Sequence, residues 1–195
     1  MKPFLQAARM LLILTVLTGV AYPLLITAVG GALFPYQANG SLERQGDTVI
    51  GSALIGQANE DSRYVWGRPS AVNYMARSQP AALGSSGASN LSSTSKTLAE
   101  AVVERAASFR TANGLAPDAH VPAEMLFASG SGLDPHISPE AARLQVARVA
   151  RERGLPLERV AALVESFVEA PQFGIFGQPR VNVLRLNIAL DGLKD

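Results

Sequence analysis

The sequence contains no cysteine, and its only histidines are His120 and His136. The absence of cysteine excludes disulfide bonds, thiolate metal sites and cysteine nucleophiles. A zinc site would have to rely on carboxylate ligands, which disfavours a metal enzyme. Lys and Arg together number 17 against 16 Asp and Glu. This balance lacks the basic excess that is usual in a general nucleic-acid-binding protein.

Charged residues are also missing from a long stretch near the N-terminus, between Arg9 and Glu43. Within it, Met10–Leu33 is almost entirely apolar and would extend roughly 36 Å as a helix, enough to cross a bilayer core of about 30 Å. Pro23 can kink a transmembrane helix without ending it. The alternative is a cleaved secretory signal, whose apolar region is usually only about 7–15 residues long. The length of this stretch favours an uncleaved anchor.

The charges on either side of this stretch predict its orientation. Lys2 and Arg9 precede it with no acid among them, whereas Glu43, Arg44 and Asp47 follow it. Because positive charge is retained in the cytoplasm, the N-terminus should lie on the cytoplasmic side of the membrane, which in a bacterium would be the inner (plasma) membrane. We therefore expect four parts, in this order: a cytoplasmic N-terminus 1–9, a transmembrane helix 10–33, a tether 34–48 and an extracytoplasmic domain 49–195.

The outer segment combines predicted strands and helices. Val49–Gln57 and Tyr64–Trp66 are typical of short strands. Lys96–Asn113 is typical of a helix that Ser95 caps. In Val181–Leu190, apolar residues alternate with a period of two, which predicts a half-buried strand. These segments predict an α+β domain in which the last strand returns to the sheet.

A serine- and glycine-rich stretch, Gly84–Ser95, precedes the predicted helix. Such a loop can hold an anion, but it lacks the lysine of a phosphate-binding P-loop. A surface loop is the simpler interpretation.

Residues 129–150, SGSGLDPHISPEAARLQVARVA, gather serines, an aspartate and a histidine in one short stretch. A catalytic triad needs a base held against the nucleophile and a carboxylate behind the base, a geometry that one turn seldom provides. Ser138-Pro139-Glu140 is instead a strong helix start, and this helix should run to Arg153 and end at Gly154. We interpret the stretch as the entry to a helix, with His136 as a structural residue.

The following segment, ARVARERGLPLERVAALV, has the spacing of a helix-turn-helix DNA reader at Ala150, Gly154 and Val160. It also fits two packed helices, because Pro156 is a natural helix start. If the orientation in the membrane were reversed, a membrane-anchored helix-turn-helix regulator would be the leading alternative function.

Several longer segments resemble a known family: VPAEMLFASGSGLDPHISPEAARLQVARVARERG, GQPRVNVLRLNIALD, GSALIGQ and GRPSAVNY. They are similar to the C subunit of the bacterial Kdp-type potassium-transporting ATPase, over nearly the whole chain. The residues that carry the resemblance are Gly51, Gln57, Arg68, Pro69, Ser70, Ser89, Asn90, Ser129, Gly130, Ser131, Gly132, Asp134, Pro135, His136, Pro179, Arg180 and Asn182.

The resemblance implies an accessory subunit of an ATP-driven, high-affinity potassium uptake complex. Its partners would be a potassium-pore subunit, a P-type ATPase subunit and membrane lipid, with no nucleic acid. The chain itself has no DKTG phosphorylation motif, no Walker sequence and only one span, so it is not expected to be the catalytic subunit. The family description adds that this subunit stabilises assembly and raises the ATP affinity of the catalytic subunit, as a catalytic chaperone.

This effect on ATP affinity can arise in two ways. The outer domain can act indirectly, by packing on the pore subunit, with no firmly bound cofactor and no metal. Alternatively, the chain shares ATP with the catalytic subunit, and Gln145 is then the candidate contact. Gln145 borders the apolar face of its predicted helix, so an ordinary interhelical hydrogen bond is the simpler interpretation.

Overall fold

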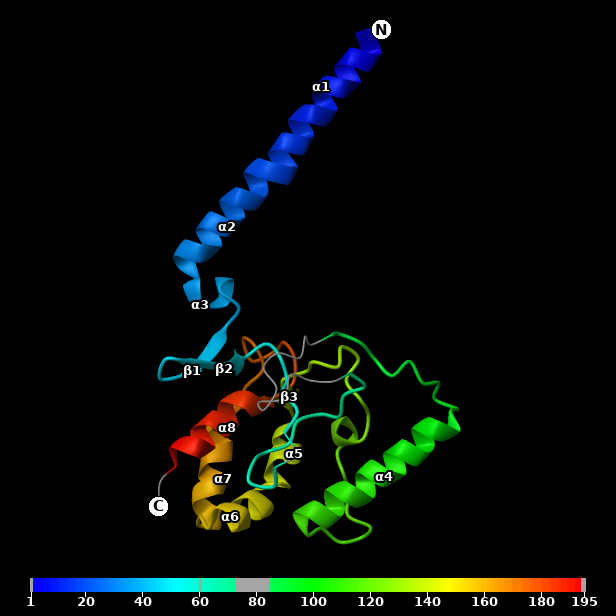
Figure 1. Ribbon diagram of the computed structural model, residues 1–195, viewed down its shortest axis with the longest axis vertical. Helices are drawn as coiled ribbons and strands as arrows, with labels where there is room; N and C mark the ends of the chain where they lie inside the picture. Colours follow the sequence, from blue (N-terminus) through cyan, green and yellow to red (C-terminus); the bar gives the residue numbers. More distant parts are fainter. Residues whose placement is uncertain (1, 60, 73–84, 194–195) are drawn as a thin grey trace. The chain divides into compact units, whose positions relative to one another are not determined.

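The computed structural model describes residues 2–59, 61–72 and 85–193 (Figure 1). The chain separates into two compact units, Met1–Leu42 and Glu43–Asp195. The first is built on a long apolar helix and the second is a mixed α/β domain, which confirms the predicted fold class.

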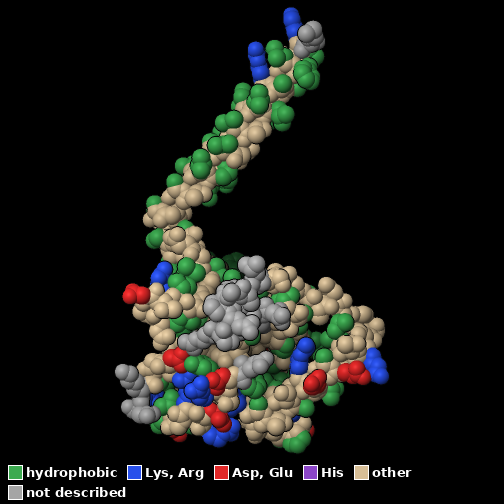
Figure 2. All heavy atoms as spheres, in the orientation of Figure 1, with side chains coloured by type: hydrophobic (Ala, Val, Ile, Leu, Met, Phe, Trp, Pro, Cys, Tyr) green, Lys and Arg blue, Asp and Glu red, His purple; other side chains and the backbone are tan. Residues whose placement is uncertain are grey.

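The first unit is a nearly continuous helix. It comprises α1 (Lys2–Val16), a π-helical turn η1 (Leu17–Ala21) and α2 (Tyr22–Leu33). The 32 residues are long and apolar enough to cross a membrane, and apolar side chains cover them along their length (Figure 2). Phe34 leaves the helical region because it precedes a proline. The short helix α3 (Pro35–Ala38) follows.

The second unit contains two small sheets. Strands β1 (Leu42–Gln45) and β2 (Thr48–Ser52) form a hairpin through Gly46, whose φ of 60° suits glycine. The other sheet has the order β3-β5-β4 and is antiparallel, with β3 at His136–Ile137, β4 at Val168–Glu169 and β5 at Arg180–Asn182. Helix α3 and strand β1 therefore lie within the segment predicted as a tether.

Helix α4 (Lys96–Asn113) matches its predicted bounds. The Ser95 hydroxyl accepts the Leu98 N–H at 3.4 Å, and Gly114 ends the helix in the left-handed region with φ 65°. A 3₁₀ turn, η2 (Ala123–Met125), comes next.

The predicted helix after Ser138 is confirmed at both ends but is divided in the middle. Ser138 caps α5 (Pro139–Arg143) by accepting the Ala141 N–H at 3.1 Å, and α6 (Val146–Arg153) ends at Gly154. The interruption falls at residues 144–145, where the Gln145 side chain is hydrogen-bonded to the Trp66 backbone. Helix α7 (Leu157–Ser166) then packs against both α5 and α6.

The predicted strand at Val181–Leu190 is wrong beyond Asn182, because Val183–Gly192 forms helix α8. The Asn182 side chain caps this helix by accepting the Arg185 N–H at 3.1 Å. Leu186 and Leu190, four residues apart on one helix face, are both fully buried. The run is so apolar that it fits both periods, and the cap decides between them.

Two other predicted strands differ from the structure. The first ends at Ser52 rather than Gln57, and Tyr64–Trp66 is not a strand, because Tyr64 lies in a bend and Val65 and Trp66 belong to no regular element. Helices α5 to α8 and the three-stranded sheet enclose the main core, to which α4 adds Phe109. Its fully buried members include Val65, Val149, Val160, Val164, Val181, Leu186 and Leu190.

Candidate functional site

Side-chain amides hold the extended residues Val65 and Trp66 in place of a neighbouring strand. The Asn187 side chain in α8 accepts the Val65 N–H at 2.9 Å and donates to the Val65 carbonyl at 2.9 Å. In the same way, the Gln145 side chain accepts the Trp66 N–H at 2.8 Å and donates to the Trp66 carbonyl at 3.1 Å. We call Gln145, Asn187 and the two backbone residues the amide clamp. It explains why this segment needs no sheet partner.

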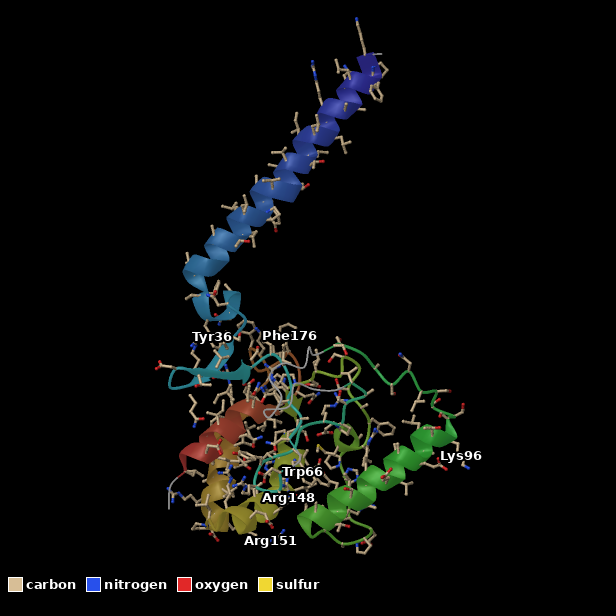
Figure 3. The ribbon with its side chains drawn as sticks, viewed as in Figure 1. Tyr36, Trp66, Lys96, Arg148, Arg151 and Phe176 are labelled. Carbon is tan, nitrogen blue, oxygen red and sulfur yellow. The ribbon has the colours of Figure 1, made fainter. Side chains whose placement is uncertain are left out.

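Arg148 in α6 completes the attachment of this segment (Figure 3). Its guanidinium donates to the carbonyls of Ser62 and Tyr64, and to the side-chain oxygens of Asn113 and Gln145. It also lies 4.1 Å from the centre of the Trp66 ring. The side chain is 1% exposed, and this burial lowers the pKa of Arg148 to about 10. The guanidinium therefore stays charged at neutral pH.

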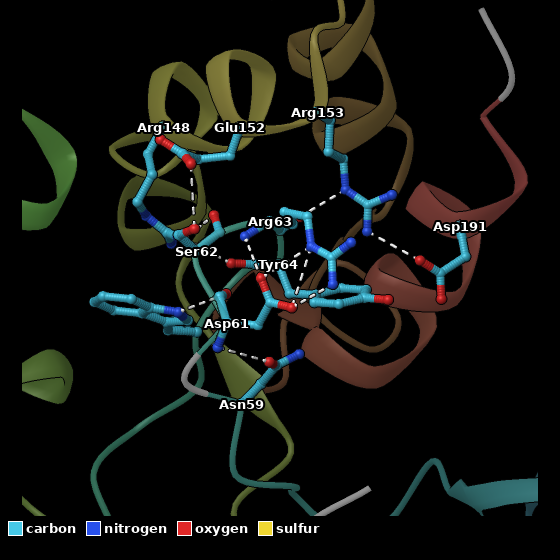
Figure 4. Close-up of polar contacts among 10 residues, drawn as sticks. Asn59, Asp61, Ser62, Arg63, Tyr64, Arg148, Glu152, Arg153 and Asp191 are labelled. Atoms are coloured by element: carbon cyan, nitrogen blue, oxygen red, sulfur yellow. Dashed lines mark hydrogen bonds and ion pairs between the residues drawn. The ribbon is translucent and has the colours of Figure 1, made fainter. Parts of the chain in front are cut away.

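Arg153 anchors the same segment at the next turn of α6 (Figure 4). It donates to the Arg63 carbonyl at 2.6 Å and pairs with Asp191 in α8 at 3.0 Å. Its guanidinium lies 4.6 Å from the centre of the Tyr64 ring. Outside this attachment, hydrogen bonds from Arg63 lower the pKa of Asp61 to about 2.

Gln145, the candidate nucleotide contact, is fully buried. Both of its amide atoms are used, because Nε2 also donates to the Ala141 carbonyl at 3.2 Å. Neither the bonds of Gln145 to Trp66 and Arg148 nor the equivalent role of Asn187 at Val65 was predicted from the sequence. One signal was available, since Gln145, Arg148 and Asn187 are polar residues on the apolar faces of helices.

The Ser129–Gly132 loop is a compact turn held by its own hydroxyls. The Ser129 hydroxyl accepts the Gly132 N–H at 3.0 Å, and the Ser131 hydroxyl accepts the Leu133 N–H at 3.1 Å. The two hydroxyls lie 3.2 Å apart. Among the described residues, neither contacts His136. This geometry supports the interpretation of the stretch as a helix entry rather than a triad.

Three segments distant in sequence meet at this loop. The Ser70 hydroxyl donates to the Gly132 carbonyl at 2.8 Å, and the Gly87 N–H donates to the Ser131 carbonyl at 2.8 Å. The Pro69 carbonyl accepts the Ser129 N–H at 3.0 Å. Gly132 has a φ of 72°, and a Cβ there would overlap the Gly87 carbonyl. The close approach of the segments therefore requires glycine.

A polar cluster follows the loop and joins it to β5. Asp134 pairs with Arg68 at 2.8 Å and accepts the His136 N–H at 3.0 Å. His136 lies opposite Asn182 in the sheet, with 3.5 Å between the His136 Nε2 and the Asn182 Nδ2. Burial, and then the charge of Arg180, lower the pKa of His136 below its ordinary value. This shift in pKa favours the neutral imidazole.

The remaining family-motif residues lie at the edges of this region. A Cβ at Gly51 would overlap the Gln57 amide, which donates to the Ile50 carbonyl at 2.9 Å. The Asn182 side chain donates to the Ala53 carbonyl at 2.8 Å, and the Pro135 carbonyl accepts the Val183 N–H at 3.0 Å. The exposed members are Ser89, Asn90, Gly130, Ser131, Pro179 and Arg180. Gly84, and Asn73 and Tyr74 of the GRPSAVNY segment, lie outside the described residues.

The helix pair α6–α7 has the order of a helix-turn-helix, but most of its arginines are occupied. Arg148 is buried, Arg153 pairs with Asp191, and Arg151 pairs with Glu152 at 3.0 Å. Arg143 in α5 pairs with Glu165 in α7. On the visible face of the second unit, acidic and basic side chains are intermingled (Figure 2). These pairings favour two packed helices over a DNA-reading surface.

The segment after β4 carries an exposed apolar tip, which we call the aromatic loop and define as residues 172–177. Phe173, Ile175 and Phe176 are 84%, 80% and 66% exposed. The Gln172 and Phe176 backbones are paired by hydrogen bonds of 2.8 and 2.9 Å. Phe173 has a φ of 55°, a conformation that strains a bulky residue. The fold therefore leaves three large apolar side chains exposed together, which is typical of a contact surface.

Within residues 2–59, 61–72 and 85–193, no group of acidic or histidine side chains is arranged to hold a metal ion. A cavity of about 30 Å³ is lined by residues including Gln57, Asp134, Pro135 and Asn187. It is far smaller than the roughly 300–1,000 Å³ of a typical small-molecule pocket.

These features define a class: a small α+β domain that follows a single membrane-spanning helix, with polar side chains used mainly to hold its own backbone. The family model for the c chain of the K⁺-transporting ATPase, KdpC, matches residues 4–192. The chain is 50% identical to the potassium-transporting ATPase KdpC subunit of Methylococcus capsulatus, over 98% of both chains. It is 51% identical to that of Sorangium cellulosum over 96% of both, and 53% identical to that of Variovorax paradoxus over 92% and 90% of the two chains. The chain belongs to the KdpC family and is thus a subunit of a Kdp potassium-transporting ATPase.

Proposed function

We propose that this chain is an accessory, non-catalytic subunit that stabilises the Kdp complex and raises the ATP affinity of the P-type ATPase subunit without touching the nucleotide. The burial of Gln145 carries the proposal. Its amide is fully enclosed and is bonded to Trp66, Ala141 and Arg148. A nucleotide could reach it only if the amide clamp opened.

The effect on ATP affinity is then a coupling between distant sites. A subunit changes affinity at a distant site only by binding one conformation of its partner better than another. A typical coupling of about 1–3 kcal/mol changes affinity by about 5- to 150-fold. The charge pattern around the span supports an extracytoplasmic location for the outer domain, and ATP is cytoplasmic. The membrane would separate the two.

The outer domain would make its contact with an apolar extracytoplasmic surface of the pore subunit. The aromatic loop fits this role, because Phe173, Ile175 and Phe176 are exposed together and the strained backbone at Phe173 points to a functional constraint. Membership of a complex supplies the partner, and burial of these side chains would stabilise the contact.

The amide clamp provides a matched test. Gln145→Ala and Asn187→Ala remove equivalent side chains from opposite ends of the clamp, yet only Gln145 is a candidate nucleotide contact. The complex should be reconstituted in lipid nanodiscs with each variant, and ATPase activity measured against ATP concentration. We expect the KM for ATP to rise in both variants only in proportion to loss of the chain from the complex. A rise in KM for Gln145→Ala alone, with assembly intact, would contradict the proposal.

Photolabelling with an azido analogue of ATP gives a second readout in the wild-type complex. We expect the label on the catalytic subunit and none on this chain. Labelling of its outer domain that excess ATP prevents would establish direct nucleotide contact instead.

A further inference from the structure

The membrane span contains a break in its hydrogen-bond ladder. In the π-helical turn Leu17–Ala21, the Tyr22 N–H donates to the Leu17 carbonyl, five residues back. An α-helix would have given this N–H to the Thr18 carbonyl, four residues back. The next residue, Pro23, has no N–H, so the Gly19 carbonyl also loses its α-helical donor. Two successive carbonyls, those of Thr18 and Gly19, are therefore left without their α-helical donors.

These carbonyls lie deep in the span. At about 1.5 Å per residue, they are roughly 5 Å from the midpoint of Met10–Leu33, well inside the roughly 15 Å half-thickness of a bilayer core. Hydrocarbon offers no hydrogen bonds, and an unsatisfied backbone group there costs several kcal/mol. A hydrogen-bond donor at this position would therefore stabilise the span.

The span's own side chains in this turn do not meet the demand. The Thr18 hydroxyl already donates to the Leu14 carbonyl at 2.7 Å. Gly19 contributes no side chain, and the space where its Cβ would lie is open, with nothing within 4 Å. A neighbouring helix can therefore approach the backbone closely at this point.

We propose that the turn Leu17–Pro23 docks a transmembrane helix of a partner subunit, which donates a hydrogen bond from a hydroxyl or amide side chain to the Thr18 or Gly19 carbonyl. The chemistry defines the occupant as a donor, because carbonyls can only accept. Membership of the Kdp complex supplies neighbouring helices. This contact concerns assembly in the membrane, so it stands independently of any effect on ATP affinity.

The sequence permits a direct measurement on the full-length chain. Gly19-Val20 is the only Gly-Val pair, and Thr18-Gly19 the only Thr-Gly pair, in the chain. Labelling with [1-¹³C]glycine and [¹⁵N]valine thus isolates the Gly19 carbonyl in solid-state NMR, and [1-¹³C]threonine with [¹⁵N]glycine isolates that of Thr18. We expect at least one carbonyl resonance to move downfield when the chain passes from lipid alone into the assembled complex.

Pro23→Ala calibrates this change in resonance and tests whether the free carbonyl contributes to assembly of the complex. The alanine N–H can donate to the Gly19 carbonyl, so the variant should show the downfield Gly19 resonance even in lipid alone. It should still insert in the membrane but co-purify less with the other subunits. Leu24→Ala, a change in the same turn that leaves the backbone donors unaltered, is the matched control and should co-purify as the wild type does.

Two results would overturn the docking proposal. One is that both carbonyl resonances are unchanged on assembly. The other is that both already lie at the downfield position in lipid alone, which would assign the donor to water, lipid or a second copy of this chain.

Discussion

Arg148 is a buried cation that lacks a carboxylate in direct contact among the described residues. Carbonyl and amide oxygens surround it instead, and the face of Trp66 lies against it. These oxygens replace the water that the guanidinium loses on burial, because an isolated buried charge would be very unfavourable. The same bonds fix the backbone at Ser62 and Tyr64. One side chain thus fastens a whole loop to helix α6.

Arg148→Met should destabilise the outer domain by about 3–5 kcal/mol. The substitution leaves the Ser62, Tyr64 and Asn113 oxygens buried without this donor, at about 1–3 kcal/mol for each group. Urea unfolding of the full-length chain in detergent measures the change. Arg151→Met is the control. The Arg151 side chain is 61% exposed and, among the described residues, its ion pair is with Glu152. The substitution should therefore change the free energy of unfolding by no more than about 0.5 kcal/mol. Equal destabilisation by the two variants would contradict the assigned role of Arg148.

Single residues of the candidate site could be predicted from the sequence only in part. The caps at Ser95, Ser138, Gly114 and Gly154 follow from local chemistry, and the structure confirms them. The pairing of Gln145 with Trp66 joins residues 79 positions apart, and that of Asn187 with Val65 joins residues 122 apart. No local pattern encodes such a pair, because an amide on a helix serves an interhelical bond, a backbone clamp or a ligand equally well.

At the scale of elements, the limit of prediction is clearest in α8. The apolar residues of Val183–Gly192 satisfy a period of two as well as a helical period, so periodicity alone misassigned it as a strand. Tyr64–Trp66 was misassigned for a different reason. Its residues favour a strand, but side chains from α8 and from the α5–α6 junction occupy its backbone groups. Tertiary contacts therefore decided the outcome at Tyr64–Trp66, whereas the local Asn182 cap decided it at α8.

The aromatic loop is an element whose role can be tested without disturbing the core. Phe173→Ser with Phe176→Ser should leave the stability of the outer domain nearly unchanged, because both side chains are mainly exposed. Burial of a large apolar side chain contributes about 1.5–3 kcal/mol, so losing two should weaken the complex at least about a hundredfold. The measurement is co-purification of the partner subunits over a range of concentrations.

Val103→Ser is the matched control for the loop. Val103 is 69% exposed but stands on helix α4, away in sequence from the loop. It should leave the recovery of the complex unchanged. If the loop variant also recovers the complex fully, the aromatic loop is not the contact with the pore subunit.

At the scale of the whole molecule, the proposals depend on which side of the membrane each unit occupies. Lys2 and Arg9 flank the span on one side, and the mixed charges of Glu43, Arg44 and Asp47 flank it on the other. Positive flanks are retained in the cytoplasm, which predicts that the residues beyond the span lie outside. With this orientation the domain cannot reach cytoplasmic ATP and its effect on ATP affinity has to be indirect, whereas a DNA-binding role for α6–α7 requires the reverse.

The absence of cysteine makes the orientation directly measurable. Val103→Cys places a single thiol at a position that is 69% exposed on α4, whereas Asn113 at the end of the same helix is 4% exposed and bonded to Arg148. A membrane-impermeant maleimide should label Val103→Cys in intact cells whose outer membrane has been made permeable. Leu5→Cys, near the predicted cytoplasmic end of the span, should be labelled only after the inner membrane is broken. The opposite pattern would place the outer domain beside the nucleotide and remove the physical reason for an indirect effect on ATP affinity.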